Sequence, residues 1–145
     1  MPSSSPVLDS ELLARFLRSR RLFGIDPPRV KPEAFIPHPY HDLSVTRHCG
    51  LTETQMWDAG QEVVREISVT EGRSITLYGR GDVLTADVRS QRLDVTPDEP
   101  PQNHAVIVGW PIGGKAEQKI IALELARKAR LVLSPATPIP AAELQ

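Results

Sequence analysis

The distribution of proline constrains this chain more than any other feature of its sequence. Five of the 14 prolines lie in residues 27–39, three in residues 97–101 and three in residues 135–140. None lies in residues 40–96. Because proline breaks helix interiors and cannot donate to a β-ladder, the clusters predict connections. The proline-free middle predicts regular structure.

The composition is that of one small globular domain. The chain has 145 residues, of which 40% are hydrophobic, and it carries 17 Lys+Arg against 18 Asp+Glu. A single cysteine, Cys49, excludes an internal disulfide. No apolar run reaches the roughly 18 residues of a membrane span, and no signal peptide is recognisable. We expect a soluble, cytoplasmic domain over residues 8–134, with a flexible tail at 1–7 and a flexible proline-rich tail at 135–145.

The first half of the chain predicts two helices and one strand. Apolar residues recur at a spacing of three to four from Leu8 to Leu17, which predicts a helix that is capped by Asp9 or Ser10 and ends at Gly24. Residues 26–41 predict an extended connection that Phe35 and Ile36 pin to the core. A strand is predicted at 43–46. A capping box, Thr52 to Gln55, begins a second helix that reaches about residue 64.

The second half predicts short strands and a long helix. Residues 75–78 predict a strand that the Gly-Arg-Gly-Asp sequence at 79–82 ends. Residues 82–91 favour a short helix, with a strand as the alternative. Strands are predicted at 93–95 and at 105–108, the latter central, and a loop follows at 109–114. Residues 115 to about 131 give the strongest helix prediction, with basic residues at the end of the segment.

These elements lack a regular βαβ alternation, which favours the α+β class. We predict a single small domain with a short mixed or antiparallel sheet of about four strands. Three helices pack against it, and the long C-terminal helix covers one face.

Charge is distributed unevenly along the chain. Residues 15–31 contain six basic residues and one acidic residue, whereas residues 40–103 contain six basic and eleven acidic residues. The basic end of the first predicted helix could dock an anionic partner; its candidate residues are Arg15, Arg18, Arg20 and Arg21. A solvated helix face is the alternative. The overall balance argues against strong nonspecific nucleic-acid binding.

The sequence from Gly109 to Lys115 has the spacing of a phosphate-binding loop, and it lies between an apolar strand and a helix. Ala116 lacks the hydroxyl that would hold Mg²⁺, which argues against nucleotide hydrolysis. A nucleotide or anion sensor that uses Gly113, Gly114 and Lys115 is one interpretation. A plain strand–turn–helix connection is the other.

A second group of residues could support acid–base chemistry on a phosphate-containing substrate. His48 and His104 are the candidate catalytic residues. Arg47, Arg80 and Lys115 are the candidate anion-binding residues, and Asp82 is a further candidate for substrate binding. Incidental placement at strand ends is the alternative. His38 and His41 are weak candidates for a metal site, and we expect no cofactor.

No catalytic motif is complete. The sequence therefore favours a small interaction or regulatory module that binds a protein partner. An enzyme of the metal-free phosphodiesterase, RNase or nucleotide transferase type is the first alternative. A nucleotide or anion sensor is the second.

Overall fold

A computed structural model of the chain describes residues 5–37 and 41–136. Its centre is a six-stranded sheet in the order β6-β7-β4-β1-β5-β8, in which every neighbouring pair is antiparallel. The strands are β1 (Leu12–Leu17), β4 (Leu43–Arg47), β5 (Gly79–Leu84), β6 (Asp94–Pro97), β7 (His104–Val108) and β8 (Arg130–Leu133). The α+β class and the antiparallel sheet are confirmed, but the sheet has six strands rather than about four.

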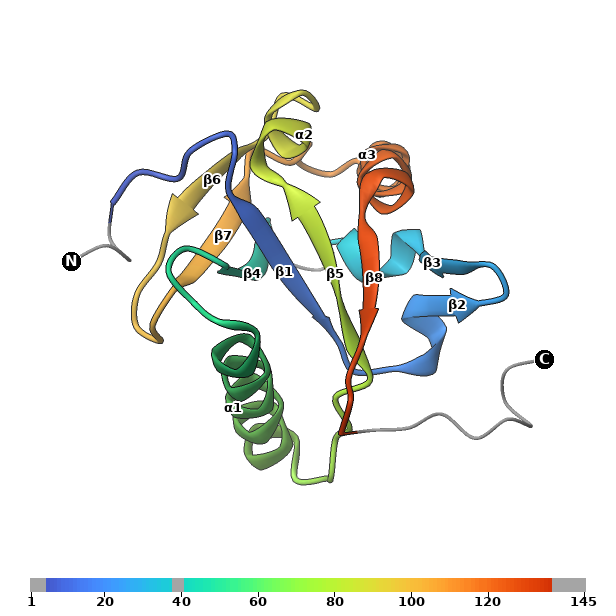
Figure 1. Ribbon diagram of the computed structural model, residues 1–145. Helices are drawn as coiled ribbons and strands as arrows, with labels where there is room; N and C mark the ends of the chain where they lie inside the picture. Colours follow the sequence, from blue (N-terminus) through green and yellow to red (C-terminus); the bar gives the residue numbers. More distant parts are fainter. Residues whose placement is uncertain (1–4, 38–40, 137–145) are drawn as a thin grey trace.

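The helices and a small hairpin lie on both sides of this sheet (Figure 1). The α-helices are α1 (Glu53–Glu71), α2 (Thr85–Arg89) and α3 (Lys115–Lys128). A two-stranded hairpin consists of β2 (Phe23–Ile25) and β3 (Pro28–Val30), and the 3₁₀ helices are η2 (Arg20–Leu22) and η3 (Pro32–Phe35). None of the helices in the described ranges is long and apolar enough to cross a membrane.

Each face of the sheet carries its own hydrophobic cluster. The larger cluster joins Leu13, Val45 and Ile107 of the sheet to Phe35 of η3 and Leu125 of α3. The smaller one joins Ala14 and Phe16 of β1 to α1 through Met56 and Val64. Alternate residues of β1 therefore reach opposite cores, as the two-residue period of a strand requires.

The helix predicted from Leu8 to Gly24 is wrong, because this segment forms β1, η2 and β2. β1 lies between β4 and β5, and it is covered on both faces. A strand that is buried on both faces is apolar at consecutive positions, so its sequence also satisfies the spacing of a helix.

The strand predicted at 75–78 is also displaced, since β5 begins only at Gly79. A Cβ atom on Gly79 would lie 2.5 Å from the carbonyl oxygen of Val132 in β8, and one on Gly81 would lie 3.0 Å from Cγ2 of Val30. The glycines that were predicted to end a strand instead permit close approach of its neighbours. Arg80 and Asp82 alternate with these glycines along β5, and their side chains point to the α1 face.

The remaining elements follow the sequence closely. The strand at β4, the capping box at Thr52 and Gln55, the interior strand β7 and the start of α3 are confirmed. The short helix is confirmed as α2, after Asp82 to Leu84 complete β5. The helix predicted to reach residue 131 ends at Lys128, and β8 follows it.

The proline-rich connection at 26–41 contains less irregular structure than predicted, because β3 and η3 form within it. Phe35 is buried and Ile36 packs against the larger cluster, as predicted. At the N-terminal end, Val7 is buried and Ser5 and Pro6 contact Arg47. The flexible tails stay predictions for residues 1–4 and 137–145, which lie outside the described residues.

Candidate functional site

A groove of about 890 Å³ lies between α1 and the sheet. Its floor includes Phe16 of β1 and Thr46 of β4, and the segment at Ile36 and Pro37 forms part of its border. The smaller hydrophobic cluster joins α1 to β1. On the same face, alternate residues of β7, such as Val106, are only half-buried.

The α1 wall of this groove has two parallel stripes. Ala59, Val63 and Ile67 recur every four residues and are half-buried. The acidic residues each precede one of them by one position; they are Asp58, Glu62 and Glu66, all exposed. A spacing of four places each set along one line of a helix. The wall therefore presents apolar surface beside negative charge.

Two arginines, Arg15 and Arg18, also line the groove. Nε of Arg15 donates to the Ala34 carbonyl and Nη1 donates to the Ser44 carbonyl, both at 2.9 Å. Burial, and to a smaller extent the charge of Arg18, lowers the pKa of Arg15 to about 10. Arg15 therefore remains a cation at neutral pH, although its hydrogen-bond partners are uncharged.

Arg18 is exposed and lies 3.7 Å from Glu71 at the end of α1. The other two arginines predicted to bind a partner lie in η2. The guanidinium of Arg20 lies over the rings of Phe23 and Tyr78, and the Arg21 backbone N–H donates to Ser19. The basic segment is thus a strand end and a 3₁₀ turn instead of a helix end, and only Arg15 and Arg18 reach the groove.

A separate polar cluster joins β5 to the beginning of α1. His48 Nε2 lies 3.0 Å from Asp82 Oδ1, and Arg80 Nε donates to both oxygens of the same carboxylate at 3.0 and 3.1 Å. Arg80 also donates to Glu53 at 2.6 Å. The structure therefore brings together three residues that the sequence predicts for the candidate site: His48, Arg80 and Asp82.

The neighbours of Arg80 compensate its charge. Its guanidinium lies 4.7 Å from the centre of the Trp57 ring. Burial lowers the pKa of Arg80, but the hydrogen bonds and charges of Glu53 and Asp82 outweigh this and raise it above its ordinary value. The same contact lowers the pKa of Glu53. This cluster fixes the first turn of α1 to the sheet.

The other catalytic candidate, His104, does not join this cluster. The register places Asp82, Ala14, Thr46 and His104 in one row across four strands. Three strand spacings separate Asp82 from His104, roughly 14 Å. His104 Nδ1 instead lies 3.1 Å from Asp98 Oδ2, and the residue lines the groove.

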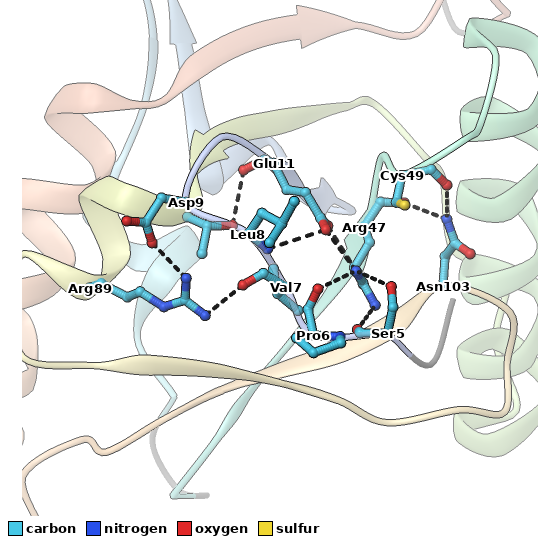
Figure 2. A network of polar contacts seen from close by, with 11 residues as sticks. Ser5, Pro6, Val7, Leu8, Asp9, Glu11, Arg47, Cys49, Arg89 and Asn103 are labelled. Atoms are coloured by element: carbon cyan, nitrogen blue, oxygen red, sulfur yellow. Dashed lines mark hydrogen bonds and ion pairs between the residues drawn. The ribbon is translucent and has the colours of Figure 1, made fainter. Parts of the chain in front are cut away.

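Arg47 lies on the opposite face and binds the N-terminal segment (Figure 2). Its side chain is wholly buried and donates to both oxygens of Glu11, at 2.9 and 2.7 Å, and to the carbonyl oxygen of Ser5. Asn103 Nδ2 donates to the carbonyl oxygens of Arg47 and Cys49. With these partners, Arg47 holds the fold together and is not available to an external anion.

The loop from Gly109 to Lys115 connects β7 to α3. Gly109 and Gly113 have positive φ values, and Gln118 Nε2 donates to the Pro111 carbonyl across the loop. Trp110 is buried and donates to the Ile107 carbonyl. Gly113 and Lys115 are exposed and Gly114 is half-buried. The structure shows a closed strand–turn–helix connection, and anion binding by Gly113, Gly114 and Lys115 stays a prediction.

The weak metal candidates find no support in the described ranges. His41 is exposed, and His38 lies outside the described residues. Within residues 5–37 and 41–136, no group of three or more His, Cys, Asp or Glu side chains is arranged to hold a metal ion.

Three features of these sites were not predicted from the sequence: Glu11 as the partner of Arg47, Glu53 as the partner of Arg80, and the acidic stripe of α1. The stripe alone has a sequence signal, since Asp58, Glu62 and Glu66 recur at helical spacing after a recognisable capping box. Comparison with protein-family models, curated proteins and solved structures finds no match.

Proposed function

We propose that this protein is a small interaction module that binds a short segment of a partner protein in the groove between α1 and the sheet. The observation that carries the proposal is the pair of parallel stripes on α1, one apolar and one acidic. The volume of about 890 Å³ lies in the range of ligand-binding pockets, about 300–1,000 Å³.

The stripes favour an extended chain as the ligand. Residues 58–67 of α1 extend for about 14 Å at 1.5 Å per residue. An extended segment of about four residues covers that length. Its alternate side chains would contact the apolar stripe and the acidic stripe in turn.

The charges of the groove favour lysine or arginine in that segment. Asp58 and Glu66 have no ion-pair partner within 4 Å among the described residues, whereas Glu62 pairs with Arg65. Glu33 and Asp42 add negative charge at the border of the groove. Complementary charge contributes mainly to the association rate and to specificity.

The enzyme alternative rests on the contact between His48 and Asp82. Asp82 also binds Arg80, which binds Glu53, so these charges compensate one another within the fold. The roughly 14 Å between Asp82 and His104 also separates the two catalytic candidates. This arrangement favours the interaction module over the enzyme.

The test is selection from a random peptide array whose members are attached through their amino termini and have free carboxyl ends. We expect the selected peptides to be rich in apolar residues and in Lys or Arg. The double variant Glu62→Lys, Glu66→Lys should bind these peptides at least tenfold more weakly. Each substitution places a positive charge on α1 beside the basic residues of the peptide.

The matched control is Asp26→Lys, which reverses an exposed charge in the β2–β3 turn, outside the groove lining. It should bind the selected peptides like the unaltered protein. Absence of any selected peptide, or equal losses in the two charge-reversed proteins, would reject the proposed function.

A further inference from the structure

Arg15 differs from the two buried arginines of this fold in its partners. Arg47 and Arg80 each bind a carboxylate, whereas Arg15 binds only two carbonyl oxygens among the described residues. Arg15 is half-buried, so its guanidinium gives up part of its hydration without an ion pair to offset the desolvation cost.

The position of Arg15 follows from the pairing of β1 with β4. These two strands are paired at Leu13 with Arg47 and at Ala14 with Thr46. Beyond Ala14, the Arg15 side chain donates hydrogen bonds to the Ser44 carbonyl of β4 and the Ala34 carbonyl of η3. Two of its three nitrogens are thereby fixed, so the guanidinium is held in one orientation.

The third nitrogen, Nη2, has no partner among the described residues, and Arg15 lines the groove. Among the described residues, Nη2 is not one of the buried polar atoms that lack a hydrogen-bond partner, so it keeps some solvent exposure. Glu33 and Asp42 line the same groove, but neither lies within 4 Å of the Arg15 guanidinium. A donor without a partner among the described residues therefore belongs to a side chain that lines a space a ligand can enter.

We propose that Arg15, through Nη2 and with Arg18 beside it, binds the terminal carboxylate of the partner's segment. This inference rests on the proposed function, because it assigns one end of the segment in the same groove. A guanidinium and a carboxylate form the stronger class of hydrogen bond, in which both partners are charged.

The acidic stripe decides between a terminal carboxylate and an acidic side chain. Asp58, Glu62 and Glu66 disfavour additional negative charge along the length of the bound segment. A basic segment that ends at its own carboxyl group has one negative charge, placed at one end. That distribution fits a groove whose lining includes two cations, Arg15 and Arg18, and three carboxylates along α1.

The experiment uses the most strongly selected peptide from the array, synthesised as a free acid and as a carboxyl-terminal amide. Isothermal titration should show that the amide binds at least tenfold more weakly, since hydrogen bonds between charged groups are the strong ones. A third peptide ends in an amide and has one internal residue replaced by glutamate. It should not recover the lost affinity.

Arg15→Gln should bind the acid and the amide equally, and both as weakly as the unaltered protein binds the amide. Arg29→Gln is the matched control, because Arg29 is exposed on the β2–β3 hairpin and, within the described part of the chain, binds only the Pro27 carbonyl. It should keep the full preference for the acid.

A second measurement does not depend on the folding of a variant. In the unaltered protein, the NMR signal of the Arg15 Nε–Hε group should shift with the acid and remain in place with the amide. Equal affinity for acid and amide would overturn the role of Arg15 and leave the proposed function intact. Recovery by the internal glutamate would also overturn it. Failure of every peptide to bind would reject both proposals.

Discussion

The Arg47 guanidinium and the Glu11 carboxylate form a two-bond ion pair, with Nε–Oε2 at 2.9 Å and Nη2–Oε1 at 2.7 Å. The Arg47 side chain is wholly buried, and that of Glu11 is 12% exposed. The pair joins the segment before β1 to the end of β4, 36 residues apart. Figure 2 shows that the same guanidinium also holds Ser5 and Pro6.

Glu11→Gln should therefore destabilise the fold strongly. It leaves a buried guanidinium without its anion, and removal of one partner from a buried pair costs about 3–5 kcal/mol. Urea unfolding measures the loss. Glu71→Gln is the control, because Glu71 pairs with Arg18 and Arg73 on the surface, where such pairs contribute at most about 1 kcal/mol. Similar losses in the two variants would contradict the structural role of Arg47.

Acid should weaken the fold partly through the same carboxylate. Burial raises the pKa of Glu11, but the Arg47 hydrogen bonds, the Leu8 N–H and nearby charges outweigh this and lower it below its ordinary value of 4.5. A carboxylate with a lowered folded-state pKa stabilises the fold above its unfolded pKa. That contribution is lost as the pH falls below about 4.5 and through the folded pKa.

The measurement is the free energy of unfolding from pH 7 to pH 3 for the unaltered protein and for Glu11→Gln. The variant should lose less stability across this acid range, because it has no carboxylate at position 11 to protonate. Parallel curves for the two proteins would show that Glu11 does not contribute to the acid sensitivity.

Asp82 should matter more for stability than His48. Asp82 accepts hydrogen bonds from Arg80 and contacts His48, and its side chain is 7% exposed against 19% for His48. Asp82→Asn weakens two contacts of a buried cation, so we expect a loss of about 1.5–3 kcal/mol. His48→Ala removes one contact and should cost about 1 kcal/mol. Thermal and urea unfolding of both variants test this order, and the reverse order would contradict the role assigned to the cluster.

Gly79→Ala should loosen the edge strand β8. The added Cβ would lie 2.5 Å from a backbone oxygen of Val132, and backbone cannot move aside as a flexible side chain can. We expect a net loss of about 1–3 kcal/mol, typical of overpacking. Hydrogen exchange should accelerate in β8 and remain unchanged in β6, at the opposite edge of the sheet. Equal acceleration at both edges would indicate a global effect instead.

Local signals in the sequence predicted the elements that close their own hydrogen bonds. The capping box at Thr52 and Gln55 satisfies donors within one turn, so four residues are enough to identify the start of α1. The absence of proline from residues 40–96 likewise indicated the regular structure from β4 to α2. These features depend on residues that are neighbours in the chain.

Only the tertiary structure decided the features that depend on distant partners. β1 is a strand because β4 and β5 pair with it on both sides, although its apolar spacing also fits a helix. The glycines of β5 continue a strand because β8 and Val30 approach them closely. β8 itself has only four residues and depends on its pairing with β5.

The candidate sites divide in the same way. The sequence determined which arginines, histidines and carboxylates exist, and it spaced Asp58, Glu62 and Glu66 along one side of a helix. The fold decided that Arg47 binds Glu11 and the N-terminal segment, while Nη2 of Arg15, a residue that lines the groove, has no partner among the described residues. A side chain's partners are fixed by pairing between strands that are tens of residues apart, and no local pattern encodes that pairing.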